Sequence, residues 1–310
     1  MKDVLLWSHG EPPPPGPRRV GIHTSTAGGV ALAAERAYRL GANTFQIFSS
    51  SPRQWKPYEL SHSQCDEMRR LRQKYNLGPL VIHTGYLVNL AGATQEFHRK
   101  SVQAFRGELQ RALALGAEYL VMHPGSFRGR SREEGLKLVA HSVAEAADGL
   151  ALEESGLRVL IENTAGAEFS LGGSFDQVAR LLEYLRPVYP VGACIDTCHT
   201  HASGYDIVSE PGWRESMRQL DATLGLSNVH VWHCNDAKDA RGSRRDRHEH
   251  IGKGRIGLQA FRRLLNHPRT AHAAFIAETP IEDPGDDLRN VETLKSLVRS
   301  TTARAKRKQA

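Results

Sequence analysis

Short apolar runs rich in β-branched residues alternate eight times with longer segments of helical periodicity along most of this 310-residue chain. This alternation is typical of βα units built around a parallel sheet. Eight such units in a stretch of about 280 residues predict a single (β/α)8 TIM barrel. The eight predicted strands span residues 20–23, 44–48, 80–83, 119–123, 158–162, 191–196, 228–233 and 273–278.

Turn and capping residues divide the helical segments. We expect a helix over 30–40 that stops at Gly41 and one over 94–115 that stops at Gly116, because glycine favours the left-handed helix end. Ser61 or Ser63 is a candidate N-cap, and residues 131–134 form a capping-box pattern. A doubly wound open sheet is the alternative fold, but the Gly-x-Gly-x-x-Gly turn typical of its first strand is missing.

Composition limits the classes of protein to which this chain can belong. An apolar content of 40% supports a large buried core, and no apolar run approaches the roughly 20 residues needed to span a bilayer. The four cysteines include no Cys-x-x-Cys pair, which favours a reducing, cytoplasmic compartment and no membrane partner.

The chain divides into three parts by composition. Residues 1–19, which contain a proline run, and residues 299–310, with five basic side chains and no acid, are predicted to be disordered. The barrel domain is expected over residues 20–298. Most of the formal net charge of +7 therefore lies in the C-terminal tail rather than in the barrel.

Imidazole and carboxylate side chains gather at the predicted strand ends. In a TIM barrel these ends converge on one face, where active sites are built. The residues that close strands three to eight are His83, His123, Glu162, Asp196, His233 and Glu278. His199 follows strand six by three positions, and Asp246 and His248 lie two apart in the segment after strand seven. The sequence therefore brings nine metal-ligand side chains to one face.

The chemistry of these side chains favours metal ions. Glu162 and Glu278 each follow three apolar residues, and burying a charged carboxylate is costly without a cation. Five imidazoles and four carboxylates suit zinc, with manganese or iron as alternatives, and nine ligands exceed the needs of one ion. We therefore expect two or three metal ions. Cys198 and Cys234 are interpreted as small buried thiols.

The motifs around these residues resemble those of endonuclease IV, the zinc-dependent AP endonuclease family (AP endonuclease family 2) of base-excision repair. The resemblance runs from about Gly21 to the last helix. The motifs are Gly21-Ile-His-Thr-Ser-Thr-Ala-Gly-Gly29, Ser51-Pro-Arg-Gln-Trp55, His83-Thr-Gly-Tyr-Leu-Val-Asn-Leu90, His123-Pro-Gly-Ser126, Ile161-Glu-Asn-Thr-Ala-Gly166, Cys194-Ile-Asp-Thr-Cys-His199, His233-Cys-Asn-Asp-Ala-Lys238 and Ser243-Arg-Arg-Asp-Arg-His248.

The resemblance implies three zinc ions, with manganese as an alternative at one site. The implied ligand sets are His83, His123 and Glu162; then Glu162, Asp196, His233 and Glu278; then His199, Asp246 and His248. Glu162 would bridge two ions and position the attacking hydroxide, and Glu278 is the second catalytic carboxylate. The implied reaction is hydrolysis of DNA 5′ to an abasic site, leaving a 3′-hydroxyl and a 5′-deoxyribose phosphate, together with trimming of blocked 3′ ends.

Two loops resemble those with which this family penetrates DNA. They carry Arg53, Gln54 and Trp55, and Tyr86 and Leu87; the alternative is that Trp55 and Leu87 simply pack on the barrel. Lys238 and Arg247 are candidate phosphate contacts. The expected partner is double-stranded DNA with abasic sites, bound by a monomer that reaches the nucleoid through its DNA.

Two rival functions remain open at this point. A metal-dependent sugar isomerase or epimerase on the same barrel would use a smaller Glu/Asp/His set and leave His199, Asp246 and His248 unexplained. A catalytically silent DNA-damage binder is the other rival, although none of the ligand residues is missing.

Overall fold

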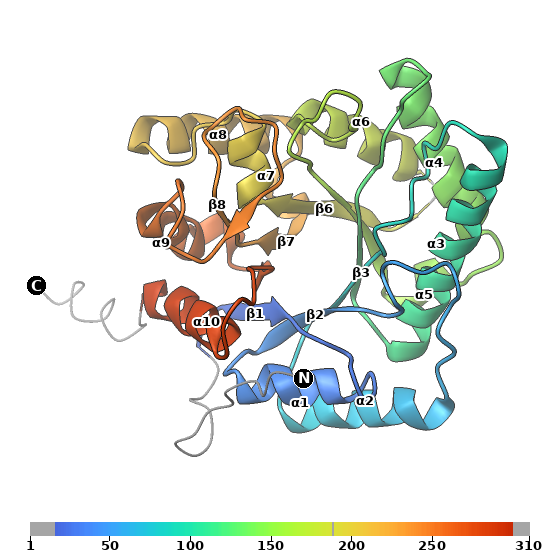
Figure 1. Cartoon of the computed structure of the whole chain (residues 1–310), viewed down its shortest axis with the longest axis horizontal. Coiled ribbons are helices and arrows are strands. Elements are labelled where there is room, and N and C mark those ends of the chain that lie inside the picture. The colour runs from blue at the N-terminus through green and yellow to red at the C-terminus, as the bar shows by residue number, and fades with distance from the viewer. Residues whose placement is uncertain (1–15, 188, 300–310) are drawn as a thin grey trace, which may run out of the picture.

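The alternating segments form a closed barrel of eight parallel strands in the order β1-β10-β7-β6-β5-β4-β3-β2 (Figure 1). The structure is a computed structural model that describes residues 16–187 and 189–299. The barrel strands are β1 (Arg19–His23), β2 (Thr44–Phe48), β3 (Leu80–His83), β4 (Tyr119–Met122), β5 (Arg158–Glu162), β6 (Val191–Asp196), β7 (Val229–His233) and β10 (Ala274–Ala277).

The predicted barrel is confirmed, and the open-sheet alternative is wrong because β1 pairs with both β2 and β10 and closes the sheet. Strands β2, β3, β5 and β6 have the predicted boundaries. The other four begin or end one residue away from the prediction, so that His123 and Glu278 lie just beyond β4 and β10 rather than inside them. The backbone at these two residues no longer pairs with the neighbouring strands, because the loops begin there.

A ring of helices surrounds the barrel (Figure 1). Eight longer helices in the described ranges each follow one barrel strand, as predicted. They are α1 (Leu32–Arg39), α2 (His62–Lys74), α3 (Gln95–Leu115), α4 (Arg132–Ala147), α6 (Phe175–Leu185), α8 (Glu210–Thr223), α9 (Leu258–Asn266) and α10 (Asp286–Leu297). The prediction missed two short helices, α5 (Leu152–Ser155) and α7 (Thr197–Ala202), and the 3₁₀ turns η1 (Leu226–Asn228) and η2 (Pro268–Thr270).

The helix boundaries follow the capping residues. Of the two candidates for α2, Ser61 is the N-cap, and it forms a capping box with Gln64. Ser131 caps α4 in the same way. Helix α3 ends at Gly116, whose φ of 64° is in the left-handed region that suits glycine.

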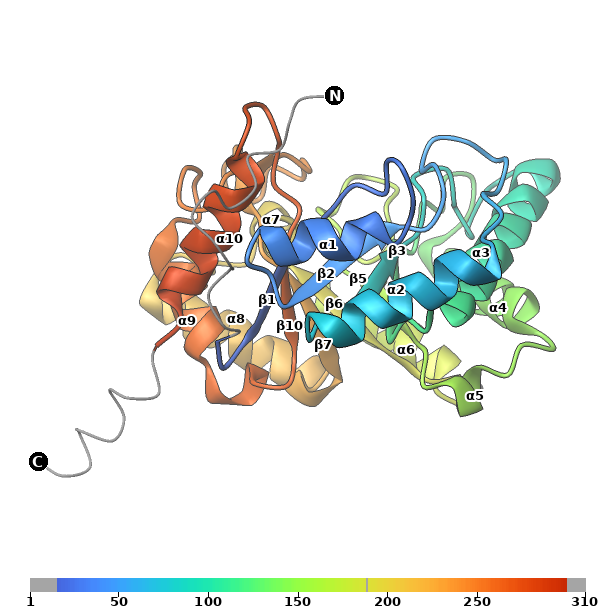
Figure 2. The same ribbon diagram turned by 90° about the horizontal axis from the view of Figure 1, so that it is seen from below.

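Apolar side chains fill two layers. One lies between the barrel and the helices, and the other lies inside the barrel around Val81, Val121, Leu160 and Val231. The interior layer is dry and packed, so the barrel is no channel. Above it, the loops that follow the strands gather on one side of the molecule (Figure 2). Several polar residues at the strand ends, such as His83, Glu162 and Asp196, are buried.

A small antiparallel pair shapes the loop after β7. Strand β8 (Asp236–Ala237) pairs with β9 (His248–Glu249). The fully buried Asp236 carboxylate accepts hydrogen bonds from the backbone N–H groups of Gly252 (2.9 Å) and Ile256 (2.8 Å). Buried backbone donors need such partners, so this carboxylate fixes the path of the loop and with it His248.

The predicted disordered ends, 1–19 and 299–310, lie largely outside the described residues, which include only 16–19 and Arg299 from them. Arg18 donates a hydrogen bond to the His267 carbonyl oxygen (3.0 Å), and Arg19 opens β1. Among the helices that the structure describes, none is both long and apolar enough to cross a membrane.

Candidate metal centre

All nine predicted ligand residues lie on the face where the strands end. Six of them close a barrel strand or follow it by one residue: His83 (β3), His123 (β4), Glu162 (β5), Asp196 (β6), His233 (β7) and Glu278 (β10). His199 lies on α7, directly after β6, and His248 opens β9. Asp246 lies two residues before it.

Glu162 lies at the middle of this group and is fully buried. Its Oε2 atom is 3.0 Å from His83 Nε2 and 3.1 Å from His123 Nε2. Its Oε1 atom is 3.0 Å from His233 Nδ1 and 3.3 Å from His199 Nδ1. The two oxygens of one carboxylate therefore face two different sets of imidazoles, the arrangement that a bridging ligand requires.

The second cluster shares Glu162. One ligand atom from each of Glu162, Asp196, His233 and Glu278 lies within 4.8 Å of every other. His233 Nδ1 is 3.2 Å from the Glu278 carboxylate. Four donors at these separations are close enough to coordinate one divalent ion.

The third cluster forms around Asp246, which is half exposed. Its carboxylate oxygens are 3.2 Å from His199 Nε2 and 3.1 Å from His248 Nε2. Asp196 is also near, with Oδ2 3.6 Å from His248 Nε2, and so is the thiol of Cys198. Burial raises the pKa of that thiol to about 12, consistent with a buried neutral cysteine.

Backbone carbonyls set the orientation of three imidazole rings. Each ring faces a carbonyl oxygen with Nδ1, which must carry a proton, so that Nε2 is the nitrogen left to bind an ion. The pairs are His83 with Thr84 (2.8 Å), His199 with Asn163 (2.9 Å) and His248 with Glu278 (3.0 Å). Each of these Nε2 atoms faces a carboxylate of the centre.

Two amide side chains, given no role in the sequence prediction, hold three further ligands. Gln46 accepts a hydrogen bond from His233 Nε2 (2.8 Å) and donates one to Glu278 (2.6 Å). Asn235 donates to Asp196 (2.6 Å) and accepts from the Glu278 N–H (2.7 Å). In the sequence, Gln46 could have been found as a polar residue inside a buried strand. Asn235 could have been found as an amide two positions after the ligand His233.

The electrostatics of the centre call for a cation. Burial opposes ionisation of Glu162, yet the imidazoles of His233 and His123 hold the pKa of its carboxyl well below the usual range. Burial also opposes protonation of His199, but Asp196 and Asp246 outweigh it and raise the pKa of that imidazole well above its ordinary value. Without an ion, protonated histidines supply the positive charge.

Among the nine ligand residues, all of which the structure describes, one buried side-chain atom is left without a hydrogen-bond partner. His248 Nε2 makes no hydrogen bond of acceptable geometry to any described residue, although an Asp246 oxygen is only 3.1 Å away. Its Nδ1 proton points at a carbonyl. Burial opposes a second proton on this imidazole, but Asp196 and Asp246 outweigh it and raise the pKa of His248 to about 9, so without an ion Nε2 is protonated as well. A metal ion between this nitrogen and the Asp246 carboxylate would displace that proton and take up the nitrogen lone pair. The residues therefore fit the ion that the sequence predicts.

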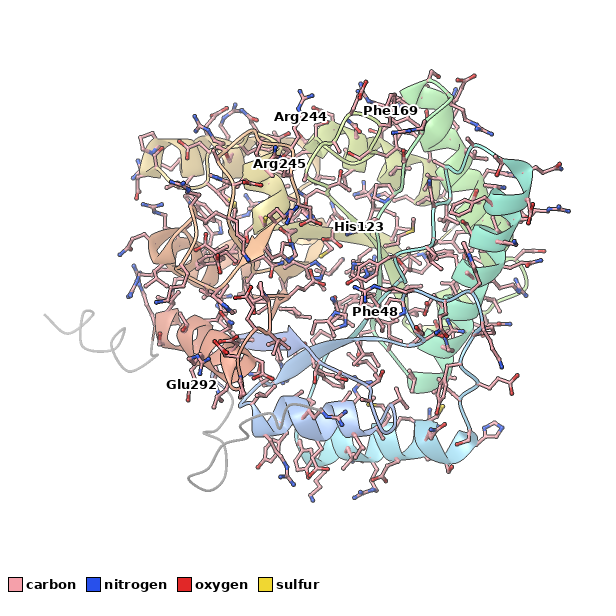
Figure 3. All side chains as sticks on the ribbon, viewed as in Figure 1. Phe48, His123, Phe169, Arg244, Arg245 and Glu292 are labelled. Atoms are coloured by element: carbon pink, nitrogen blue, oxygen red, sulfur yellow. The ribbon has the colours of Figure 1, made fainter. Side chains whose placement is uncertain are left out.

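A cavity of about 350 Å³ opens directly over the centre. Its lining includes His83, His123, His199 and Asp246, with Arg244 at the rim. In Figure 3, His123 lies near the middle of the ring of helices, with Arg244 on the α6–α7 side and Phe48 on the opposite side. A polar substrate group can thus reach the ligands from solvent.

The predicted loop residues lie at one edge of this face. Arg53, Gln54 and Trp55 are exposed in the loop between β2 and α2, and Tyr86 in the loop after β3 is 63% exposed. The Arg53 guanidinium is 5.9 Å from the centre of the Tyr86 ring. Leu87 is half-buried and lines a cavity beneath the loops.

Lys238 and Arg247 form a separate, exposed set beside the β8–β9 pair. The Lys238 N–H donates to the Arg247 carbonyl oxygen (2.9 Å), and the Lys238 ammonium is 3.5 Å from Glu282. The two predicted groups of DNA-contacting residues therefore lie in different loops: Lys238 and Arg247 follow β7, whereas the first group follows β2 and β3.

Comparison with known proteins decides the family. The sequence model of the family described as xylose isomerase-like TIM barrel matches residues 34–299. A Solibacter usitatus protein named probable endonuclease 4 is 51% identical over 284 residues, which are 91% of this chain and 97% of that one. The chain belongs to the endonuclease IV family.

Solved structures agree with this assignment. The crystal structure of endonuclease IV from Thermus thermophilus superposes with a TM-score of 0.78 at 38% identity, covering 90% of this chain and 98% of that one. A D-tagatose 3-epimerase-like protein superposes with a TM-score of 0.67 at 19% identity, covering 94% and 100%. The second likeness shows only that this chain and that protein share the barrel fold.

Proposed function

We propose that the chain is a zinc-dependent apurinic/apyrimidinic endonuclease of DNA base-excision repair. It hydrolyses the phosphodiester 5′ to an abasic site, leaves a 3′-hydroxyl and a 5′-deoxyribose phosphate, and trims blocked 3′ ends by the same chemistry. The observation that carries the proposal is Glu162, whose two oxygens face two clusters of ligand atoms in a member of the endonuclease IV family.

Three ions are proposed, with manganese as an alternative at one position. The first is held by His83, His123 and Glu162; the second by Glu162, Asp196, His233 and Glu278; the third by His199, Asp246 and His248. Nitrogen and carboxylate donors at this spacing suit zinc, and the orphaned Nε2 of His248 supports the third site. Zinc, when bound, supplies Lewis acidity that activates water near neutral pH and compensates the negative charge of a phosphodiester.

The protein side chains supply the geometry of the reaction. Glu162 fixes two of the proposed sites relative to each other, because one rigid carboxylate belongs to both. Glu278 is the second carboxylate assigned to catalysis, and Gln46 and Asn235 hold its orientation. Such positioning is worth several powers of ten in rate when the reacting atoms depend on it.

Selection of the lesion is assigned to the two loops beside the centre. Arg53, Gln54, Trp55, Tyr86 and Leu87 would fill the gap left by an extruded nucleotide. Extrusion costs a few kcal/mol and is cheapest where base pairing is already lost, which favours an abasic site. Lys238 and Arg247 would contact phosphates on the other side of the cavity.

A duplex with one tetrahydrofuran site tests the proposal. We expect purified protein to nick it on the 5′ side of the lesion, and prolonged chelation to abolish nicking until zinc is restored. Under the same conditions, ketoses and aldoses should remain unchanged. Isomerised sugar without DNA nicking would overturn the proposal in favour of the epimerase alternative, and binding to the lesion without nicking would favour the silent binder.

The same preparation tests the proposed assembly. We propose that the barrel domain, residues 20–298, acts as a monomer in the cytoplasm and reaches the nucleoid through its DNA substrate. Light scattering of the zinc-loaded protein should give the 34.3 kDa of one chain. A mass of twice that value would contradict a monomer.

A further inference from the structure

A buried ion pair without a role in the metal centre lies on helix α3. Glu108 and Arg111 are only 6% and 9% exposed, and Arg111 Nη2 is 3.0 Å from Glu108 Oε2. Both contact Ser49: Arg111 Nε donates to its hydroxyl (2.7 Å), and the hydroxyl donates to Glu108. Burying an ion pair gains little stability over apolar packing, so its retention here suggests another role.

Ser49 connects this pair to the first predicted DNA loop. It is the residue directly after β2 and therefore the base of the loop that carries Arg53 to Trp55. The far end of that loop is closed onto the same base, since the Tyr58 N–H donates to Ser50 Oγ (3.0 Å). Fixing Ser49 therefore restrains the start of the loop and, through the neighbouring Ser50, its far end as well.

The second loop is joined to the first through its backbone. The Tyr86 N–H donates to the Pro52 carbonyl oxygen (2.9 Å). A Cβ atom at Gly85 would be 3.1 Å from Pro52 Cα, so the two backbones meet where only glycine fits without displacement. The Phe48 ring, one residue before Ser49, contacts the Tyr86 ring edge-on at 5.3 Å. The two loops therefore form one unit, which we call the loop pair (residues 50–58 and 84–88).

A hollow of about 690 Å³ lies beneath the loop pair, between it and α3. Trp55 and Leu87 line it from the loops, and Glu108 and Arg111 line it from the helix. Two sets of contacts hold the first loop to α3: the hydrogen bonds through Ser49, and the edge-on contact of Trp55 with Phe97, whose ring centres are 5.4 Å apart.

We infer that Glu108 and Arg111 are positioning residues for damage recognition, which act through Ser49 to hold the loop pair in the conformation that enters DNA. This inference rests on the proposed function, because it assigns to the loop pair the contact with the lesion. Preorganised loops lower the ordering cost of binding, so loss of the anchor should weaken substrate binding more than it slows the chemical step.

The test replaces Glu108 with an uncharged side chain of the same size. In Glu108→Gln, KM for the tetrahydrofuran duplex should rise about tenfold while kcat changes less than about threefold. Zinc content should stay at the wild-type value. The matched control is Glu67→Gln, which removes the acid of an exposed i,i+3 Glu–Arg pair on α2 and should change neither constant. A fall in kcat with unchanged KM would overturn the inference.

A second arm does not depend on activity. Amide hydrogen exchange in Glu108→Gln should quicken over residues 50–58 and 84–88 together, because both segments lose one anchor. Exchange that quickens only within α3 would overturn the inference, even if KM rises. If the wild-type protein does not nick DNA, the proposed function fails while exchange still tests the anchor.

A double variant separates positioning from general destabilisation. In the Tyr86→Ala background, adding Glu108→Gln should raise KM by less than about twofold, since the loop contact is already lost. Fully additive effects would contradict action through the loop pair. If Glu108→Gln does not fold, Arg111→Lys, which keeps the charge but cannot reproduce the forked contacts, serves the same comparisons.

Discussion

Glu162 is the residue on which the metal centre depends most. It is fully buried at the end of β5, and four imidazole nitrogens lie within 3.3 Å of its oxygens. An ionised carboxylate at such a position is stable only with compensating positive charge. The imidazoles provide that charge in the metal-free protein, and the proposed ions would take over this role.

Replacing Glu162 tests its bridging role. Glu162→Gln keeps the volume but offers one neutral oxygen, so it should lose zinc and slow the chemical step by several powers of ten. Elemental analysis and single-turnover kinetics measure the two effects. Glu168→Gln, an exposed acid in the loop after β5, is the control and should behave like wild type. Near-wild-type turnover with full zinc content would refute the bridge.

Gln46 tests whether the hydrogen bonds behind the ligands matter. Gln46→Leu removes the acceptor of His233 Nε2 and the donor to Glu278, so both ligands lose a fixed orientation. We expect zinc affinity to fall about 10- to 100-fold, as for other supporting residues of metal sites. Competition with a zinc-binding dye measures this change. Unchanged affinity would mean that packing alone orients the two ligands.

The metal-ligand residues could be predicted from the sequence, whereas the contacts that hold them in place could not. His83 and Glu162 could be predicted because barrel topology brings all strand ends to one face. The contact between Gln46 and Glu278 could not, because it joins residues 232 positions apart and depends on β1 and β10 closing the barrel beside β2. The contact between Ser49 and α3 could not be predicted either, because no residue near Ser49 in the sequence indicates it.

At the scale of elements, strand β7 has a histidine near each end with opposite surroundings. His233 faces carboxylates at the centre, whereas the His230 ring stacks on Tyr119 at 5.4 Å near the opposite end of the strand. Burial, Arg158 and His272 lower the pKa of His230 to about 4. One strand thus supports a ligand at one end and a neutral structural imidazole at the other.

This difference predicts a pH dependence of stability. An unfolded chain protonates histidine near pH 6.5, whereas folded His230 stays neutral down to about 4. The unfolded state binds the extra proton in this window, so the His230 contribution to stability is complete above about pH 6.5 and is lost as pH falls towards 4.

The variant His230→Gln removes this titration. The loss of unfolding free energy between pH 7.5 and pH 4.5 should shrink by on the order of 1–2 kcal/mol, allowing for partial exposure of the ring. Urea denaturation at the two pH values measures it. His141→Gln, on the exposed side of α4, is the control. If His230→Gln loses as much unfolding free energy between the two pH values as the wild type, the assignment of this pH dependence to His230 is contradicted.

At the scale of the whole molecule, charge is focused rather than spread. Five of the basic residues lie in the last twelve positions, and the face that would meet DNA carries four acids committed to the proposed ions. Three divalent ions would add six positive charges to that face. Attraction for DNA is therefore expected to depend on metal content more than on the tail.

Removing residues 300–310 tests this distribution. The shortened chain loses four basic side chains and should bind undamaged duplex more weakly at low salt, with a smaller salt slope. Its kcat on the tetrahydrofuran duplex and its zinc content should not change. Fluorescence anisotropy across a salt series measures the binding. A marked fall in kcat would show that the tail contributes to the reaction.

The zinc content of fully active protein tests the central claim most directly. Elemental analysis of a preparation that nicks the tetrahydrofuran duplex should give about three zinc ions per chain, one for each proposed set of ligands. Stepwise removal of the metal should reduce nicking in parallel. Full activity with one ion per chain, or with none, would contradict the account.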